Sequence, residues 1–269
     1  MNQSIGFIGG GNMAEAIIGG LRKTDKDIQI RVTNRANHER IQRLVDKYSI
    51  KASEFQELVE NSRVLVIAVK PKDVREVLKH LKNYTLQDKL IISIAAGIPL
   101  KVFHKYLPDV AVIRAMPNTS TAVLHSMTGL VREETITQAQ AETATEIFSA
   151  IGRILWIPEE KMNALIALSG SGPAYFYLFT ESLIQAGVQL GLREEEAELL
   201  ARETLIGAGK MLTESDKSPA RLREEVTSPN GTTFAALSVF NEDKLAQIVM
   251  KAAQACARRA EDMEGEYSE

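Results

Sequence analysis

The sequence is poor in cysteine and carries no excess of positive charge. Its single cysteine, Cys256, cannot form an intramolecular disulfide, and the surrounding AAQACARRA is typical of a small apolar position on a helix, in a core or an interface. Lysine and arginine number 32 against 35 aspartate and glutamate residues, and they are scattered among the acids. Nucleic acid is therefore not an expected partner.

Long hydrophobic runs are also missing. No stretch reaches the roughly 20 apolar residues that a membrane span requires, and the N-terminus lacks the basic start and apolar core of a signal peptide. We therefore expect a cytoplasmic protein with no membrane partner, and we expect no metal site. A chain of 269 residues with 45% hydrophobic and 25% charged residues is typical of a globular protein, and its length favours two domains.

The first part of the chain alternates between apolar, strand-like runs and helical patterns. This alternation predicts a Rossmann-type, doubly wound parallel sheet with helices on both faces. The expected strands are Ser4–Ile8, Ile28–Val32, Val64–Val69, Leu90–Ile94, Val110–Met116 and Ile151–Ile157, and the expected helices include Glu39–Tyr48 and Val74–Leu81.

After Pro158 the pattern becomes helical throughout. We expect a Rossmann domain over residues 1–158 and an all-α domain over 159–269, with helices at Ala174–Leu190, Glu194–Thr213, Thr232–Phe240 and Leu245–Glu261. Several of these segments are apolar on more than one side, as in LIGAGKML and IVMKAAQACA, which predicts a helical dimer interface. Burial of such helices within one subunit is the alternative.

Three consecutive glycines follow the first expected strand, in GFIGGGNMAEAI. Gly9, Gly11 and Ala14 match the pattern G-x-G-x-x-G/A, in which the first glycine makes a tight turn and the second lets a diphosphate approach the backbone. The small third residue lets the helix pack closely on the strand. Dinucleotide binding is the favoured interpretation, and a purely structural turn is the alternative.

The end of the second expected strand bears on the choice of dinucleotide. NAD-selective folds usually place an acid there, but this chain reads Thr33-Asn34-Arg35. A guanidinium beside hydroxyl and amide groups suits a 2′-phosphate, which favours NADPH, with NADH also usable. Alternatively, Arg35 is a solvated loop residue.

Three further turns follow later strands, at the sheet edge where such folds bind ligands. They are AVKPKD with Lys70-Pro71, SIAAGIPL with Ala95-Ala96-Gly97, and RAMPNTS with Asn118 and Thr119. Small residues and amide or hydroxyl groups at these places would suit a ribose and a nicotinamide, although ordinary β–α turns have the same composition.

The helical part contains two further turns that lead into helices. ALSGSGPAYFYL carries Ser169 to Gly172 ahead of a proline, and EEVTSPNGTTFAAL carries Ser228 to Thr233 ahead of an apolar helix. Exposed amides and hydroxyls at such a helix start could bind a small carboxylate, and a simple helix cap is the alternative.

Taken in order and spacing, these blocks resemble the pyrroline-5-carboxylate reductase family, the last enzymes of proline biosynthesis. The resemblance covers essentially the whole chain, and LSGSGPAY followed by VTSPNGTT is its most specific part. The chain departs from the family pattern at Ser120, where proline is common, and at Asn230, where a second glycine is common. Because asparagine tolerates a positive φ better than most residues, we expect the turn at Asn230 to survive.

The resemblance implies reduction of the cyclic imine 1-pyrroline-5-carboxylate to L-proline, by hydride transfer to the imine carbon. It implies that Thr233 hydrogen-bonds the ring nitrogen and that Ser228 and the amides of Gly231 to Thr233 bind the substrate carboxylate. It also implies that Asp216 borders the pocket, and the alternative for Asp216 is an ordinary charged loop residue. It also implies a homodimer, which in some members assembles into rings of dimers. The expected cofactor-binding residues are Ile8, Gly9, Gly10, Gly11, Asn12, Met13, Asn34, Arg35, Val69, Lys70, Pro71, Ala95, Ala96, Gly97 and Asn118, and the substrate-binding residues are Asp216, Ser228, Gly231, Thr232 and Thr233.

Two other functions fit parts of the sequence. A β-hydroxyacid dehydrogenase also joins a Rossmann domain to helices, but its lysine base has no counterpart in a glycine-rich turn, since Lys161 and Lys210 lie elsewhere. A non-catalytic, NADP-binding regulator would keep the fold without the reaction. None of the four histidines falls in a motif turn, so each is read as a surface or core residue.

Overall fold

The computed structural model describes residues 4–35 and 37–268, which form two compact units. Among these residues, the first unit contains those up to Ser171 and those from Cys256 onward, and the second contains Gly172–Ala255. The composition changes at Pro158, but the following residues up to Ser171 pack with the first unit, as do the last turns of the final helix. Met162, Ile166 and Ala260 are buried in the core of this unit. A domain boundary at 158/159 remains a proposal.

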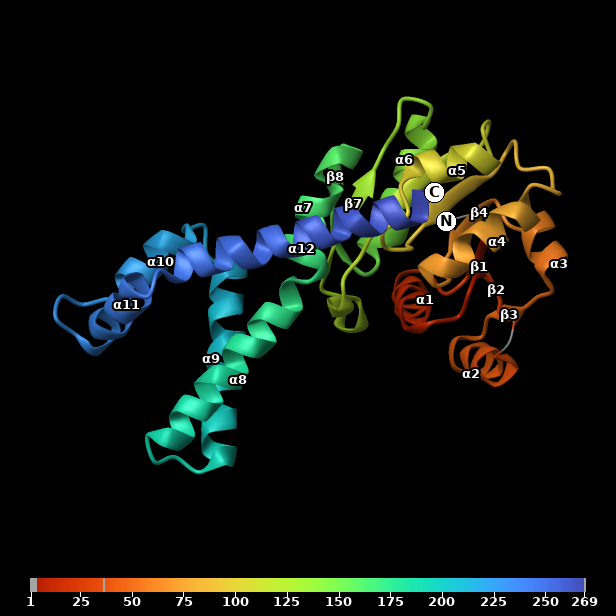
Figure 1. Cartoon of the computed structure of the whole chain (residues 1–269). Coiled ribbons are helices and arrows are strands. Elements are labelled where there is room, and N and C mark those ends of the chain that lie inside the picture. Colours follow the sequence, from red (N-terminus) through yellow and green to blue (C-terminus); the bar gives the residue numbers. More distant parts are fainter. Residues whose placement is uncertain (1–3, 36, 269) are drawn as a thin grey trace. The chain divides into compact units, whose positions relative to one another are not determined.

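An eight-stranded sheet forms the centre of the first unit (Figure 1), in the order β3-β2-β1-β4-β5-β6-β7-β8. All neighbouring strands are parallel except β6 and β7. The strands are β1 (Ser4–Ile8), β2 (Gln29–Thr33), β3 (Lys51–Ala52), β4 (Val64–Ile67), β5 (Leu90–Ser93), β6 (Ala111–Met116), β7 (Ser126–Val131) and β8 (Gly152–Ile157).

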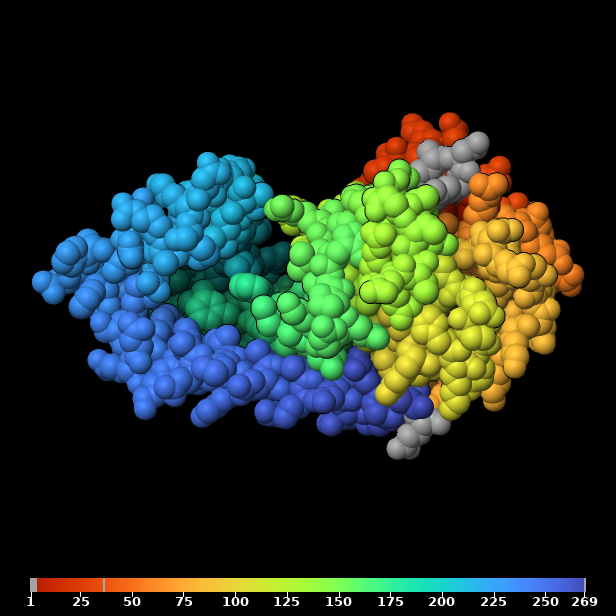
Figure 2. All heavy atoms as spheres, turned by 90° about the horizontal axis from the view of Figure 1, so that it is seen from above, coloured from red at the N-terminus to blue at the C-terminus, as the bar shows by residue number. Residues whose placement is uncertain are grey.

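Helices connect the strands of this unit and cover the sheet. They are α1 (Asn12–Thr24), α2 (His38–Tyr48), α3 (Phe55–Glu60), α4 (Pro71–Leu81), α5 (Leu100–Tyr106), α6 (Gln138–Ser149) and α7 (Met162–Leu165), with short turns η1 (Thr119–Val123), η2 (Glu159–Lys161) and η3 (Ile166–Gly170). Figure 2 shows the unit as one continuous packed body, with the last turns of α12 (Leu245–Ser268, dark blue) against it.

Alternate side chains of the central strands enter two separate cores, because successive residues of a strand face opposite sides of the sheet. In β4, Val64 and Val66 face the core that includes residues of α1, α2 and α6. Leu65 and Ile67 face the other core, which includes residues of α3, α4, α5 and the end of α12. Both faces of the sheet are therefore covered, as the apolar runs predict.

The strands predicted from the sequence are confirmed to within one or two residues at their ends, but two strands escape the apolar pattern. β3 has only two residues, and β7 buries the polar side chains of Ser126 and Thr128 in place of an unbroken apolar run. β7 is also antiparallel to β6. The sheet is thus not wholly parallel, because the segment between Met116 and Ser126 is too short for a crossover helix.

The second unit is helical, as expected. It contains α8 (Gly172–Gln189), α9 (Glu194–Glu214), α10 (Pro219–Glu225), α11 (Thr232–Glu242) and the first turns of α12. α8 and α9 form a hairpin, with Gly191 at a φ of +99° between them. Within the described residues, this unit leaves many apolar side chains exposed, such as Phe176 at 60% and Leu178 at 64%.

Across residues 4–35 and 37–268, no helix is both long and apolar enough to cross a membrane.

Candidate cofactor and substrate sites

The carboxyl ends of the parallel strands line up along one edge of the sheet. Backbone hydrogen bonds tie the following turns together: Gly9 N donates to the Thr33 carbonyl at 2.9 Å, and Ala68 N donates to the Ile8 carbonyl at 2.9 Å. Ile94 N donates to the Ile67 carbonyl at 3.1 Å. The turns after β1, β2, β4 and β5 therefore lie side by side, and β1 and β4 meet where the strand order reverses, which is where such sheets bind ligands.

The glycine turn after β1 has the backbone that its sequence predicts. Gly9 has a φ of +110°, and a Cβ there would lie 2.5 Å from the Ala68 carbonyl oxygen, so no larger residue fits. Gly11 is the residue before α1 and is exposed, and a Cβ on it would meet no atom within 4 Å. The open space at Gly11 fits the approach of a diphosphate to the backbone.

The neighbours of these two glycines have structural roles. A Cβ on Gly10 would lie 2.8 Å from Ile41 Cδ1, so this glycine lets α2 pack against the turn. Ala14 is buried at 1% exposure and Met13 packs against the same core. Asn12 is exposed at the first position of α1. The amides of Gly11 to Ala14 have no carbonyl one turn earlier in the helix, since Glu15 N is the first to donate to Gly11 O.

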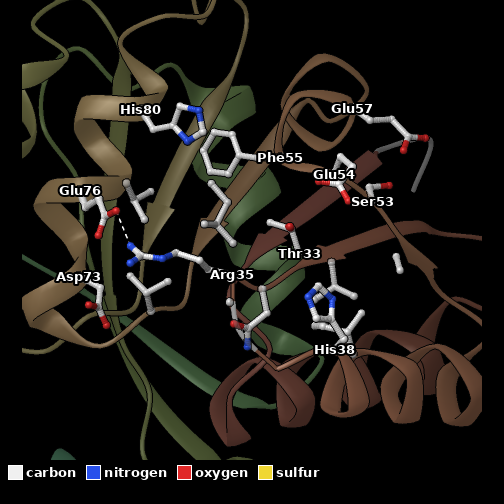
Figure 3. A pocket seen from close by; sticks show the side chains of 18 residues that line it. Thr33, Arg35, His38, Ser53, Glu54, Phe55, Glu57, Asp73, Glu76 and His80 are labelled. Carbon is white, nitrogen blue, oxygen red and sulfur yellow. Dashed lines mark hydrogen bonds and ion pairs between the residues drawn. The ribbon is translucent and has the colours of Figure 1, made fainter.

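A cavity of about 870 Å³ lies beside this turn (Figure 3). Five of the residues expected to bind the cofactor line it, namely Ile8, Gly9, Asn34, Arg35 and Val69. The other lining residues are Val32, Thr33, His38, Ile41, Ala52, Ser53, Glu54, Phe55, Glu57, Asp73, Glu76, Val77 and His80.

Arg35 extends across this cavity to the carboxylate of Glu76 on α4, with which it forms an ion pair (Figure 3). Both side chains are largely exposed, at 78% and 66%. The guanidinium is therefore accessible to an anion that enters the cavity, and such an anion would compete with the Glu76 carboxylate. The volume of the cavity and the Arg35 guanidinium fit a phosphorylated dinucleotide, with Arg35 as the phosphate-binding group, while the carboxylates of the lining belong to Glu54, Glu57, Asp73 and Glu76.

Sequence reasoning missed the wall formed by α3 and α4. Phe55 stacks on His80 with their ring centroids 4.2 Å apart, and both rings line the cavity (Figure 3). His38 lines it too, although the sequence suggests only a surface or core histidine. The sequence does contain a signal for this wall. Asp73, Glu76 and His80 follow one another at three- and four-residue spacing along α4, so they share one face of the helix.

The next two turns along the edge differ in exposure. Lys70 is exposed before α4, and Pro71 is the first residue of that helix. Ala95 is buried, and Gly97 has a φ of +72°. A Cβ on Gly97 would lie 3.2 Å from Met263 Cβ of α12, so close packing with this helix adds to the backbone requirement for glycine.

Asn118 follows β6 but directs its side chain into the protein. Its Nδ2 donates to the Ser169 carbonyl at 3.1 Å and to Ser169 Oγ at 3.3 Å, and its Oδ1 accepts from Ser120 N at 3.1 Å. The side chain is 8% exposed. The structure thus uses this amide to join two turns, and a direct contact of Asn118 with a nicotinamide remains a prediction.

In the second unit, the expected substrate-binding residues gather at the start of α11. Gly231 N donates to the Ser228 carbonyl at 3.0 Å, and the first helical bond runs from Ala235 N to the Gly231 carbonyl. The amides of Thr232 and Thr233 therefore belong to the helix start that has no earlier carbonyl partner. Asp216 is exposed in the loop between α9 and α10.

Comparison with known proteins identifies the family. Residues 159–263 match the family model described as "Pyrroline-5-carboxylate reductase dimerisation". Residues 4–97 match a second model, described as "NADP oxidoreductase coenzyme F420-dependent". The chain is 40% identical to the pyrroline-5-carboxylate reductase of Pasteurella multocida, over 97% of this chain and 98% of that one. The chain belongs to the pyrroline-5-carboxylate reductase family. The reductase of Pseudomonas aeruginosa is 38% identical, over 96% of both chains.

Solved reductase structures share the fold. The enzyme from Coxiella burnetii superposes with a TM-score of 0.92 at 37% identity, covering 98% of this chain and 99% of that one. A Plasmodium falciparum pyrroline carboxylate reductase with NADP bound superposes with a TM-score of 0.83 at 29% identity, covering 98% of both chains.

Both departures from the reductase pattern are accommodated locally. Asn230 has a φ of +54°, so asparagine adopts the left-handed backbone that the turn before α11 requires, as predicted. Ser120 supplies a backbone N–H to Asn118, which proline could not do. Neither departure removes a hydroxyl or amide from the candidate sites.

Proposed function

We propose that the protein reduces 1-pyrroline-5-carboxylate to L-proline with NADPH as the hydride donor. The observation that carries this proposal is membership of the reductase family along the full chain, with the Ser228–Thr233 turn intact at the start of α11. In the first unit, the open backbone at Gly11 and the cation Arg35 beside a large cavity support binding of a phosphorylated dinucleotide. The dihydronicotinamide would supply a hydride to the imine carbon.

The residues at the start of α11 suit the two polar groups of this substrate. The amides of Thr232 and Thr233 and the hydroxyl of Ser228 would bind the carboxylate, which the positive end of the helix dipole also favours. The Thr233 hydroxyl would donate a hydrogen bond to the ring nitrogen as it becomes an amine. A protonated imine is already electrophilic, so binding and orientation supply most of the catalysis. Asp216 is proposed as a residue of the pocket border.

The cofactor residues are proposed in the same way. Ile8 and Gly9 to Met13 would bind the diphosphate, and Asn34 with Arg35 the 2′-phosphate. Val69 to Pro71, Ala95 to Gly97 and Asn118 would line the ribose and nicotinamide positions, with Asn118 acting through the turn that it holds in place.

Purified protein tests the function directly. Addition of 1-pyrroline-5-carboxylate should cause oxidation of NADPH, faster than of NADH, and mass spectrometry should detect proline. Thr233→Val should lower kcat by about tenfold to a hundredfold, because one hydrogen bond to the reacting nitrogen is lost, while the Kd for NADPH stays unchanged. Tight NADPH binding without turnover would instead point to a regulator or to another imine substrate.

We propose a homodimer formed through the second unit. The match to a dimerisation domain and the exposed apolar side chains of α8, α9 and α12 support it. Sedimentation would distinguish a dimer from a larger ring of dimers, and a monomer at micromolar concentration would contradict the proposal. A cytoplasmic location, which cell fractionation can test, is also proposed.

A further inference from the structure

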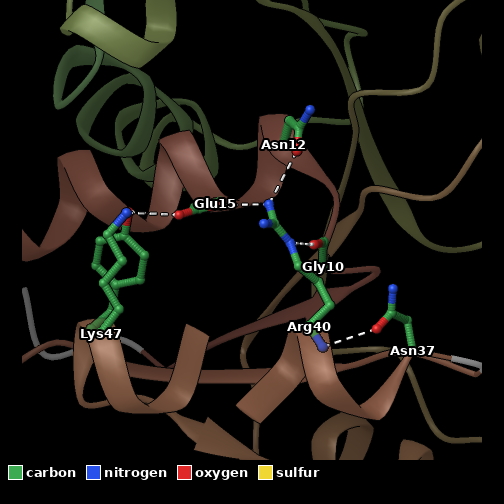
Figure 4. A network of polar contacts seen from close by, with 7 residues as sticks. Gly10, Asn12, Glu15, Asn37, Arg40 and Lys47 are labelled. Atoms are coloured by element: carbon green, nitrogen blue, oxygen red, sulfur yellow. Dashed lines mark hydrogen bonds and ion pairs between the residues drawn. The ribbon is translucent and has the colours of Figure 1, made fainter. Parts of the chain in front are cut away.

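Arg40, in the first turn of α2, connects this helix to the glycine turn (Figure 4). Its Nε donates to the Gly10 carbonyl at 3.2 Å, and its Nη2 donates to Asn12 Oδ1 at 3.1 Å. The same Nη2 forms an ion pair with Glu15 on α1. One guanidinium therefore contacts the turn, the first residue of α1 and an acid one turn further along that helix.

The contact with the Gly10 carbonyl determines the direction of the next amide. The Gly10 carbonyl and the Gly11 N–H belong to one planar peptide, which is trans, so they point in opposite directions. Because Arg40 holds the carbonyl on the side of α2, the Gly11 N–H points away from that helix. Gly11 itself is exposed, so an anion can approach its backbone.

Glycine makes this peptide unusually free to rotate. Because neither residue has a Cβ, the peptide plane between Gly10 and Gly11 can turn over, so that its carbonyl and N–H exchange directions, at little steric cost. In the opposite orientation a carbonyl oxygen, rather than an N–H, would face an incoming phosphate. A residue that holds the carbonyl thus prepares the turn for an anion before the anion arrives.

The positive charge of Arg40 is already paired within the protein, which distinguishes this residue from one that binds phosphate directly. Its side chain is 24% exposed, and Glu15 neutralises it. Glu15 also accepts from Lys47 Nζ at 3.0 Å and from the Tyr48 hydroxyl at 3.2 Å. Partial burial raises the pKa of Glu15, but the hydrogen bond from Lys47 and the charge of Arg40 are the main causes that bring it below its ordinary value.

We propose that Arg40 is a positioning residue that holds the Gly10–Gly11 peptide in the orientation that binds the diphosphate of the dinucleotide. The inference rests on the proposed function only in taking the ligand to be a dinucleotide. Since NADPH and NADH share the diphosphate, loss of Arg40 must weaken both by the same factor. Loss of Arg35 must weaken NADPH alone.

The test compares Arg40→Met with two matched variants of the same helix. Lys47→Met removes another partner of Glu15 that does not contact the turn, and Arg43→Met removes an exposed arginine. The Kd values for NADPH and NADH are measured by calorimetry on the full chain without substrate. Arg40→Met should raise both by roughly tenfold, as expected for loss of a hydrogen bond from a charged donor, with kcat at saturating cofactor unchanged. The two control variants should stay within twofold of the parent protein.

A spectroscopic measurement separates positioning from general loss of structure. In protein labelled with ¹⁵N-glycine, Arg40→Met should shift or broaden the Gly11 amide signal, whereas Lys47→Met should leave it in place. If Arg40→Met does not fold, Arg40→Lys serves instead, because it retains a cation for Glu15 but lacks the Nε donor, and it should show the same equal loss for both cofactors.

Three results would overturn the inference. They are unchanged Kd values for both cofactors, a loss confined to NADPH, and an unaltered Gly11 signal. Failure of the parent protein to bind either dinucleotide would overturn the proposed function as well, which distinguishes the two failures.

Discussion

Replacement of Arg35 by glutamine tests the basis of cofactor choice. The side chain of Arg35 lines the cavity and is 78% exposed, and its partner is Glu76, which is itself 66% exposed. Glutamine keeps a polar, though shorter, side chain but removes the charge and the paired donors that match a phosphate. Only NADPH carries a phosphate on the ribose, so the change should act on one cofactor and spare the other.

The magnitude follows from two opposing contributions. A hydrogen bond to a charged group contributes about 1.5–3 kcal/mol, and the exposure of Arg35 places this contact at the lower end. Release of Arg35 from an exposed ion pair costs up to about 1 kcal/mol. The net effect is about 1 kcal/mol or slightly more, which corresponds to a Kd for NADPH that is about five- to tenfold higher in Arg35→Gln.

Calorimetry with both cofactors decides the matter. Arg35→Gln should weaken NADPH by that factor and change the Kd for NADH by less than about twofold. Glu76→Gln is the complementary variant, since it frees Arg35, and it should strengthen NADPH binding by up to about fivefold. Equal losses for both cofactors in Arg35→Gln would refute the assignment of Arg35 to the 2′-phosphate.

Three further predictions concern stability. Asn230→Val should destabilise the fold by about 1–2 kcal/mol, because a β-branched residue does not tolerate a φ of +54°, whereas Asn230→Gly should be neutral in a thermal melt. Arg114→Met should cost about 2–3 kcal/mol in urea unfolding, because Arg114 is 2% exposed and pairs with Glu159 at 3.1 Å and Glu264 at 2.7 Å, while these two carboxylates are partly exposed and so cost less when left unpaired than fully buried ones; a cost below 1 kcal/mol would contradict this. Glu15→Gln should lower stability at pH 7. Since the pKa of Glu15 is lowered on folding, its contribution is present above the unfolded pKa and disappears as the pH falls through the folded value, so melts of parent and variant should converge in acid.

Local backbone requirements were the part of the fold and site most readily predicted from the sequence. Gly9 and Gly11 stand in a turn whose chemistry needs glycine, and the structure gives them a positive φ and an open backbone respectively. Asn230 likewise adopts the predicted positive φ. Such features can be predicted because the backbone conformation and the residue type that permits it belong to the same position in the sequence.

Features that depend on distant partners were not predictable. β7 buries Ser126 and Thr128, which hydrogen-bond each other, so no apolar run marks it as a strand. The residue types around Asn118 suggest that its side chain contacts the cofactor, but its amide donates a hydrogen bond to the Ser169 carbonyl, 51 residues later in the sequence. The stacking of Phe55 on His80 likewise depends on how α3 packs against α4, and no local sequence pattern specifies that packing.

Deuterium transfer from NADPH to proline tests the proposed reduction of the imine. The protein is given 1-pyrroline-5-carboxylate with NADPH that carries deuterium on one face of C4, and then with NADPH labelled on the other face. One of the two labelled cofactors should yield proline one mass unit heavier, with the deuterium on the former imine carbon. Unlabelled proline from both, or NADPH oxidation without proline, would contradict hydride transfer to the imine.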